Sequence, residues 1–178
     1  IARMHEERVE QMLMVDENGQ VLEILTLDSL EQPVKKENWV VLMAGGLGTR
    51  LRPLTEDIPK PMLQVGGSPI LEILINNFKN QGFYKFYICV NYRADVIRGY
   101  FGDGAQHGVK ICYIEEKEQM DTAGALSLIE EKSPFPMFVV NGDIVTSLNF
   151  AEMLNFHLEH NAAATMAIRE HSMLIPYG

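Results

Sequence analysis

The chain has 178 residues, of which 47% are hydrophobic, and it carries a formal net charge of −9. That length and apolar content allow one main globular domain with a sizeable core. The acidic balance argues against nucleic acid or an anionic membrane surface as the main partner, and no run of about 20 apolar residues is present that would span a membrane. Cys89 and Cys112 fall in predicted strands, where we expect buried free thiols, and the cytoplasm is the expected compartment.

Residues 1–38 are more acidic than the rest, with nine acidic and four basic side chains. Two short apolar runs within residues 12–26 flank the sequence Asp-Glu-Asn-Gly, which predicts a β-hairpin, and residues 27–38 read as a polar linker. The hairpin resembles the closing hairpin of a CBS module, a small regulatory unit that often binds adenine nucleotides. A plain N-terminal hairpin is the alternative interpretation.

From residue 39 onward, predicted strands and helices alternate. The strands are expected over residues 39–44, 85–91, 109–115, 137–141 and 162–169, and the helices over 69–81, 94–101, 122–132 and 149–160. This alternation predicts an α/β fold with a mostly parallel sheet. Ligands of such sheets bind beyond the carboxyl ends of the strands, where residues 45–50, 91–93 and 141–143 are expected.

A glycine-rich loop follows the first of these strands. Gly45, Gly46 and Gly48 allow a ligand to approach the backbone, whose N–H groups then form a site for an anion. Neither the P-loop nor the dinucleotide fingerprint fits the glycine spacing. Arg50 and Lys60, which stands between two prolines, add two cations nearby. These cations favour a phosphate site over an ordinary strand-to-helix connection.

Residues 44–51 (AGGLGTRL) and 59–63 (PKPML) closely resemble the signature of the sugar-phosphate nucleotidylyltransferases, and the resemblance extends over residues 39–178. It implies a Rossmann-like three-layer sandwich, the nucleotide-diphospho-sugar transferase fold, incomplete at its C-terminus. It also implies transfer of a nucleoside monophosphate from a nucleoside triphosphate to a sugar 1-phosphate, with release of pyrophosphate. Residues 156–165 resemble bacterial members close to mannose-1-phosphate guanylyltransferase, which favours GTP and a mannose-like or amino sugar.

Joining two phosphate anions requires charge screening, alignment and a stabilised leaving group. The resemblance assigns these tasks to three catalytic residues. Arg50 is expected over the triphosphate, Lys60 at the phosphates of the reacting centre, and Asp143 as a ligand of Mg²⁺, a hard cation that prefers carboxylates and phosphate oxygens. An N-cap of a short turn is the alternative interpretation of Asp143.

The resemblance implies a nucleotide-binding set made of Ala44, Gly45, Gly46, Gly48, Thr49, Arg50, Arg93 and Gly124. Arg93 is a candidate for reading the base, and Gly124 belongs to a segment that lines the base pocket in the family. Asp121 stands where the family commonly has glycine, which places a negative charge near an anion site. Glu116 matches a common family acid and is expected to orient the loop.

On the sugar side, the resemblance implies contacts from Asn141, Tyr177 and Gly178. The partners it implies are a nucleoside triphosphate and a sugar 1-phosphate, and it allows for a homo-oligomer and for an adenine nucleotide at the CBS-like region. Two alternative functions stay open. One is a nucleotide-sensing regulator on the same fold, and the other is a cytidylyltransferase for a phosphocholine-like substrate.

We expect the isolated 178-residue chain to bind a nucleoside triphosphate weakly but not to complete catalysis. In the family, a lysine for the sugar phosphate and a second metal-binding aspartate follow the position of Gly178, so the chain is expected to be part of a longer protein. A pyrophosphate assay with nucleoside triphosphate and sugar 1-phosphate tests this expectation. Steady turnover by the isolated chain would contradict it.

Overall fold

A computed structural model describes residues 9, 11–26, 33–116, 120, 123–131 and 133–170. The chain divides into two compact units, Ile1–Leu148 and Asn149–Gly178. The first unit holds two β-hairpins, a four-stranded sheet and the helices α3 (Ile70–Lys79) and α4 (Ala94–Phe101). The second holds helix α5 (Phe150–Glu159).

The four-stranded sheet is fully parallel and has the order β7-β6-β3-β8. Its strands are β3 (Lys36–Met43), β6 (Phe83–Val90), β7 (Lys110–Glu115) and β8 (Phe138–Asn141). The sheet confirms the predicted α/β class and its parallel strands. Strand β3 begins three residues earlier than predicted, because the Lys36 amide already donates to the Gly82 carbonyl at 2.8 Å.

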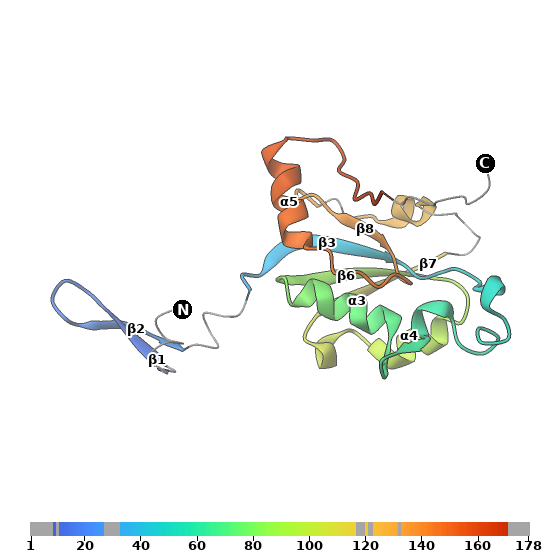
Figure 1. The fold of residues 1–178 in the computed structure, drawn as a ribbon, viewed down its shortest axis with the longest axis horizontal. Coiled ribbons are helices and arrows are strands. Elements are labelled where there is room, and N and C mark those ends of the chain that lie inside the picture. Colours follow the sequence, from blue (N-terminus) through green and yellow to red (C-terminus); the bar gives the residue numbers. More distant parts are fainter. Residues whose placement is uncertain are drawn as a thin grey trace, which may run out of the picture. The chain divides into compact units, whose positions relative to one another are not determined.

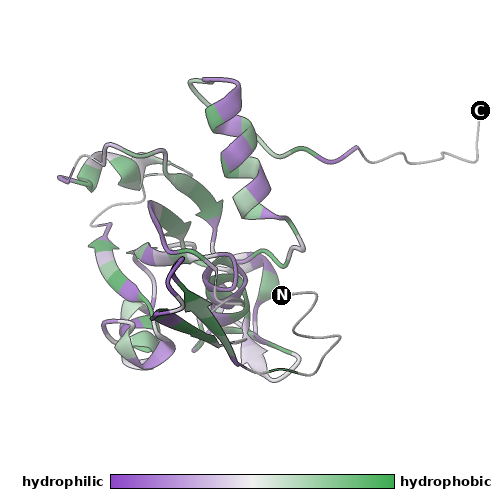
Figure 2. Cartoon of the chain, turned by 90° about the vertical axis from the view of Figure 1, so that its left-hand side faces the viewer, coloured by the Kyte–Doolittle hydropathy of each residue, from purple (hydrophilic) through white to green (hydrophobic). Residues whose placement is uncertain are grey.

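Helices α3 and α4 cover one face of the sheet (Figure 1). Helix α3 buries Leu71, Leu74, Ile75 and Phe78, the spacing of one helical face. The Phe78 ring meets the rings of Phe83 and Phe138 at centroid distances of 5.5 Å each, in edge-to-face geometry. This aromatic cluster fixes the helix over strands β6 and β8. The strands beneath it are strongly hydrophobic (Figure 2).

The opposite face of the sheet is covered by the short 3₁₀ helix η4 (Gly124–Leu128). Trp39 and Val41 of β3 and Tyr87 of β6 form a buried cluster with Ala125 of η4. Trp39 stacks on Tyr87 with ring centroids 4.1 Å apart. Because side chains alternate along a strand, β3 contributes to both layers. The result is the three-layer arrangement that the resemblance implies.

Two predicted elements are wrong. The predicted helix over 122–132 is only the 3₁₀ turn η4 in its described part, and Ile129 already has an extended backbone. Leu126 and Ile129 both pack against the Trp39 cluster, and their spacing of three residues fits a 3₁₀ turn as well as an α-helix. Asp121 and Thr122 lie outside the described residues.

The predicted strand over 162–169 is irregular chain. Met166 and Ile168 there are 81% and 86% exposed. A strand needs a neighbour that accepts and donates its backbone hydrogen bonds, and no described strand pairs with this segment. The preceding helix agrees with prediction: α5 begins after Asn149, whose side chain accepts from the Glu152 amide at 3.0 Å.

The predicted N-terminal hairpin is confirmed as β1 (Gln11–Val15) paired antiparallel with β2 (Val21–Thr26). The Asp16 carboxylate accepts from the amides of Asn18 at 2.9 Å and Gln20 at 2.8 Å. These bonds, chiefly the one from Gln20, hold the pKa of Asp16 below its usual range. Gly19 completes the turn with φ +80°. The likeness of this hairpin to a CBS module stays a prediction.

Both cysteines are free thiols; Cys89 is buried as predicted, whereas Cys112 is only partly buried. Burial, with a smaller contribution from the charge of Glu116, raises the pKa of Cys89 to about 12. None of the described helices combines the length and apolar character needed to cross a membrane.

We predict that Phe78→Ala lowers the free energy of unfolding by about 3–5 kcal/mol, because it empties the aromatic cluster between α3 and the sheet. Urea unfolding followed by circular dichroism measures the change. Phe135→Ala is the matched control, since the Phe135 side chain is 48% exposed and its loss should cost less than about 0.5 kcal/mol. Equal losses in the two variants would contradict this account of the core.

Candidate active site

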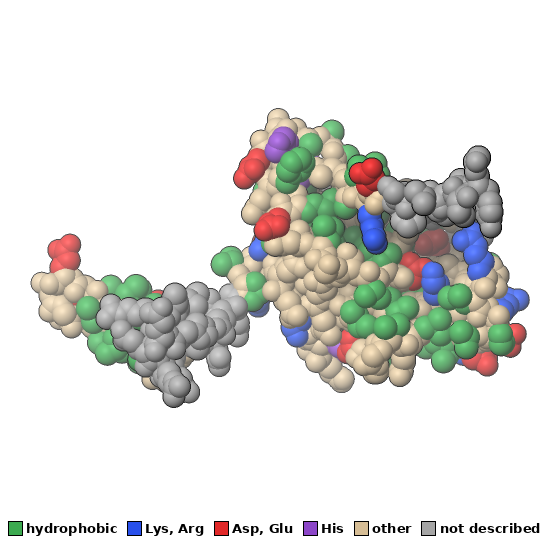
Figure 3. Space-filling view, in the orientation of Figure 1, with side chains coloured by type: hydrophobic (Ala, Val, Ile, Leu, Met, Phe, Trp, Pro, Cys, Tyr) green, Lys and Arg blue, Asp and Glu red, His purple; other side chains and the backbone are tan. Residues whose placement is uncertain are grey.

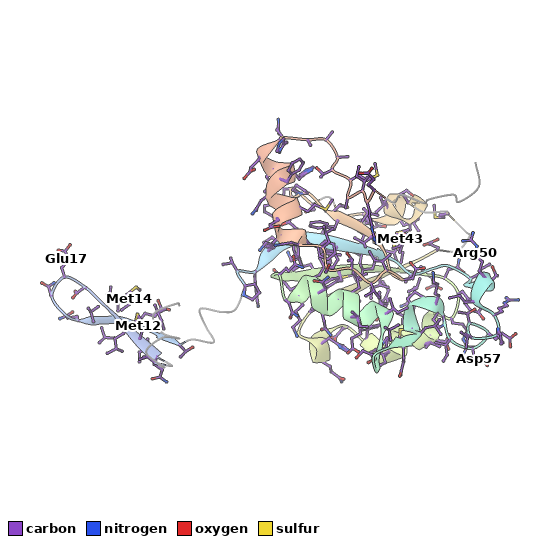
Figure 4. All side chains as sticks on the ribbon, in the orientation of Figure 1. Met12, Met14, Glu17, Met43, Arg50 and Asp57 are labelled. Atoms are coloured by element: carbon purple, nitrogen blue, oxygen red, sulfur yellow. The ribbon has the colours of Figure 1, made fainter. Side chains whose placement is uncertain are left out.

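A cleft of about 520 Å³ lies at the carboxyl ends of β3 and β8. Residues 43–51 line one side of it, and the remaining wall is made by Lys60, Pro61, Glu116, Asn141 and Asp143. Figure 4 shows Met43 at the end of β3 and Arg50 and Asp57 in the loops beyond it. Cationic and acidic side chains gather at this end of the sheet (Figure 3). The cleft is where parallel sheets place their ligands.

The glycine-rich loop is shaped by two close approaches. A Cβ at Gly45 would lie 3.1 Å from Oε1 of Glu116, so only glycine fits there without displacing that carboxylate. Gly48 has φ +63°, and a Cβ there would lie 3.1 Å from the Thr55 side chain. Thr55 is completely buried and its hydroxyl donates to the Gly48 carbonyl at 2.7 Å. The buried Thr55 therefore holds the loop in place, and the loop residues line the cleft.

The loop leads into the 3₁₀ turn η1 (Thr49–Leu51), which contains Arg50. A second 3₁₀ turn, η2 (Lys60–Met62), begins at Lys60 and buries Pro61 and Met62. This burial fixes the backbone that carries the lysine, whereas η1 buries none of its residues. Both predicted cations line the same cleft.

Asp143 reaches the cleft because β8 ends in a tight turn. The Gly142 amide donates to the Met43 carbonyl at 2.8 Å, and a Cβ at Gly142 would lie 3.1 Å from that oxygen. The Asp143 carboxylate forms an ion pair with Nζ of Lys60 at 2.5 Å. Their side chains are 29% and 39% exposed. Two of the three predicted catalytic residues are thus in direct contact.

Glu116 is a buried acid in this cleft, only 7% exposed. Its amide donates to the Val90 carbonyl at 3.0 Å, and its carbonyl accepts from Nδ2 of Asn91 at 2.8 Å. No described residue forms a hydrogen bond or ion pair with its carboxylate, and neither carboxylate oxygen is a fully buried atom that lacks a partner. The carboxylate therefore opens onto the cleft beside Gly45, where a ligand with hydrogen-bond donors can reach it.

Nine predicted site residues line the cleft together: Ala44, Gly45, Gly46, Gly48, Thr49, Arg50, Lys60, Asn141 and Asp143. Arg93 and Gly124 are not among its lining residues. The Arg93 guanidinium lies 3.8 Å from Asp57 and 3.7 Å from Asp95. Gly124 opens η4, where a Cβ would lie 2.6 Å from the Cβ of Met120.

Tyr177 and Gly178 lie outside the described residues. Glu116 was expected only to orient the loop, and its place in the cleft wall was not predicted. The sequence does contain a signal for this position, because Glu116 directly follows a predicted parallel strand, where ligands of such sheets bind.

The chain matches the family described as Nucleotidyl transferase over residues 39–178. It belongs to the nucleotidyl transferase family. The resemblance carried by the glycine-rich loop and the lysine between two prolines is thereby confirmed.

Among curated members of the family, the chain is 34% identical over 143 residues to probable mannose-1-phosphate guanylyltransferase 1 of Oryza sativa subsp. japonica, covering 78% of this chain and 40% of that protein. It is 38% identical over 130 residues to mannose-1-phosphate guanyltransferase of Yarrowia lipolytica, covering 71% of this chain and 36% of that protein. The chain thus spans about two fifths of the length of these relatives.

Two solved structures of similar proteins share the fold. HddC from Yersinia pseudotuberculosis, complexed with GMP-PN, has a TM-score of 0.57 and 33% identity, with 68% of this chain and 55% of that chain covered. A putative glucose-1-phosphate thymidylyltransferase from Bacillus anthracis, in complex with a sucrose, has a TM-score of 0.61 and 26% identity, with 67% and 50% covered.

We predict that Gly48→Ala lowers the free energy of unfolding by about 1–2 kcal/mol, because alanine at φ +63° is strained and meets the Thr55 side chain. Gly46→Ala, two residues earlier in the loop, is the matched control. A Cβ at Gly46 has no neighbour within 4 Å, so its effect should stay within about 0.5 kcal/mol. Urea unfolding of both variants decides; a loss at Gly46 as large as at Gly48 would contradict the described loop.

Proposed function

We propose that the protein transfers GMP from GTP to a sugar 1-phosphate, with mannose 1-phosphate the favoured acceptor, and releases pyrophosphate in nucleotide-sugar biosynthesis. Membership of the nucleotidyl transferase family and the names of the Oryza and Yarrowia relatives support this proposal. The GMP-PN complex of HddC supports the choice of guanine nucleotide.

In this reaction an oxygen of the sugar phosphate forms a bond to the α-phosphorus of GTP, while the bond from that phosphorus to the β-phosphate oxygen breaks. The reacting groups are anions, so alignment and charge screening supply most of the catalysis. Backbone N–H groups of residues 45–49 would bind the triphosphate, and the planar guanidinium of Arg50 would bridge its oxygens. Lys60 would contact the phosphates at the reacting centre, and Asn141 would face the sugar.

Asp143 fits a role as a Mg²⁺ ligand. Its carboxylate is partly exposed, lines the cleft and lies beside the proposed phosphate contact Lys60. Among the described residues, no cluster of three or more His, Cys, Asp or Glu side chains could hold a metal alone. Asp143 would therefore hold the ion together with phosphate oxygens, as Mg²⁺ sites commonly do. When bound, the ion would neutralise charge on those oxygens.

The Glu116 carboxylate, which lines the cleft beside Gly45, is the observation that carries the choice of GTP. A carboxylate accepts hydrogen bonds and repels phosphate, so its partner must be a donor. Guanine presents an N–H and an exocyclic amino group side by side, which suits the two oxygens of one carboxylate. Adenine and cytosine pair their amino group with an adjacent acceptor, and uracil has one N–H between two acceptors. We therefore assign reading of the guanine edge to Glu116.

We predict that the full-length protein releases pyrophosphate fastest with GTP among GTP, ATP, CTP and UTP when mannose 1-phosphate is present, and that chelation of divalent cations stops the release.

Glu116→Gln should lower kcat/KM for GTP about tenfold to hundredfold, because one carboxylate oxygen is replaced by a donor that meets the donors of guanine. The same variant should reduce the preference for GTP over ATP.

Glu115→Gln is the control, because Glu115 is the neighbouring residue and its exposed carboxylate pairs with Arg98 at 3.2 Å. It should leave kcat/KM within about twofold of the parent value. Release with CTP and phosphocholine alone would favour the cytidylyltransferase alternative, and nucleotide binding without any release would favour a sensor. Either result would overturn the proposed function.

A further inference from the structure

The turn between β6 and α4 contacts one residue of the cleft wall, Glu116, and the segment that joins the glycine-rich loop to Lys60. It consists of Asn91, Tyr92 and Arg93, and Arg93 has a left-handed backbone with φ 51°. Arg93 and Tyr92 do not line the cleft themselves. Their contacts instead reach the segment that joins the glycine-rich loop to Lys60.

Tyr92 makes the central contact. Its hydroxyl donates to the Glu56 carbonyl at 2.5 Å and lies 3.4 Å from the Thr55 carbonyl. Thr55 in turn donates its hydroxyl to the Gly48 carbonyl at 2.7 Å. Two side chains therefore connect the end of β6 to the glycine-rich loop in one continuous path.

The two flanking residues extend this contact on either side. Nδ2 of Asn91 donates to the Glu116 carbonyl at 2.8 Å, and its Cβ lies 3.3 Å from where a Cβ at Gly45 would stand. The Arg93 guanidinium lies 3.8 Å from the Asp57 carboxylate. Asn91 thus contacts Glu116, the residue proposed to read the base, while Arg93 lies near Asp57, three residues before Lys60.

The segment held in this way has little regular structure of its own. Residues 52–58 form turns and bends between η1 and η2, and the side chains of Glu56 and Asp57 are exposed. Turns of this kind open at low free-energy cost unless contacts from outside hold them. The Tyr92 hydroxyl supplies such a contact at the midpoint between Arg50 and Lys60.

We propose that Tyr92 is a positioning residue, which braces residues 52–58 so that Arg50 and Lys60 are both held toward one nucleoside triphosphate. This inference rests on the proposed function. It assigns the β6–α4 turn to preorganisation of the phosphate site, in place of the base contact expected for Arg93. Preorganisation of this kind improves affinity by reducing the ordering cost on binding.

The test compares Tyr92→Phe with Tyr113→Phe in the full chain. The Tyr113 hydroxyl also donates to a backbone carbonyl, that of Gly102 at 2.8 Å, and neither residue of that pair lines the cleft. Equilibrium binding of GTP should show a Kd about fivefold higher in Tyr92→Phe, the factor expected for one hydrogen bond of ordinary net strength. Tyr113→Phe should bind as the parent does. In turnover, KM for GTP should rise by the same factor while kcat stays unchanged.

Hydrogen exchange without any ligand separates this inference from the proposed function. Amides of residues 48–58 should exchange faster in Tyr92→Phe than in the parent and Tyr113→Phe proteins. Faster exchange in a protein that binds no nucleotide would support the brace and reject the proposed function. Unchanged exchange in Tyr92→Phe, or equal losses of affinity in the two variants, would overturn the brace.

Discussion

Parallel pairing of β3 with both of its neighbours is the constraint from which the geometry of the cleft follows. Met43 at the end of β3 is in register with Cys89 of β6 and with Asn141 of β8. Because the three strands end level, the loops that leave them converge at one edge of the sheet. Shifting any one strand by a residue would turn its side chains to the other layer. By holding the strands in register, the aromatic cluster on one face and the Trp39 cluster on the other maintain the geometry of the cleft as well as the core.

The cleft contains two cations, Arg50 and Lys60, and two carboxylates, Glu116 and Asp143, in a chain that is acidic overall. A chain with a net charge of −9 offers a triphosphate little general attraction, so binding depends on local cations and oriented backbone N–H groups. In the proposed function Arg50 and Lys60 would provide the cations, and the Lys60 ammonium forms an ion pair with the Asp143 carboxylate. Glu116 adds a second carboxylate to the cleft wall, and in the proposed function this carboxylate would face the hydrogen-bond donors of the base and not the phosphates.

Much of this arrangement could be predicted from residue types. The glycine-rich loop, Lys60 between prolines and the helix over 94–101 all depend on local chemistry that a sequence displays directly. The helix predicted over 122–132 failed because a spacing of three residues fits two kinds of helix. The environment of Glu116 could not be predicted, because its carboxylate occupies space that a side chain at Gly45 would fill, and the two residues lie far apart in the sequence. Nor could the contact of Tyr92 with Glu56, which joins residues 36 positions apart in the chain.

The position of Trp39 gives the protein an internal optical reporter. It is the single tryptophan of the chain, it is 3% exposed, and it lies on the η4 side of the sheet against Tyr87. The ammonium groups of Lys110 and Lys85 lie 5.2 Å and 5.8 Å from its ring. Its emission therefore reports on the η4 layer, which is the layer opposite α3 and α4. Loosening of that one face of the sheet can thus be followed in an unmodified sample.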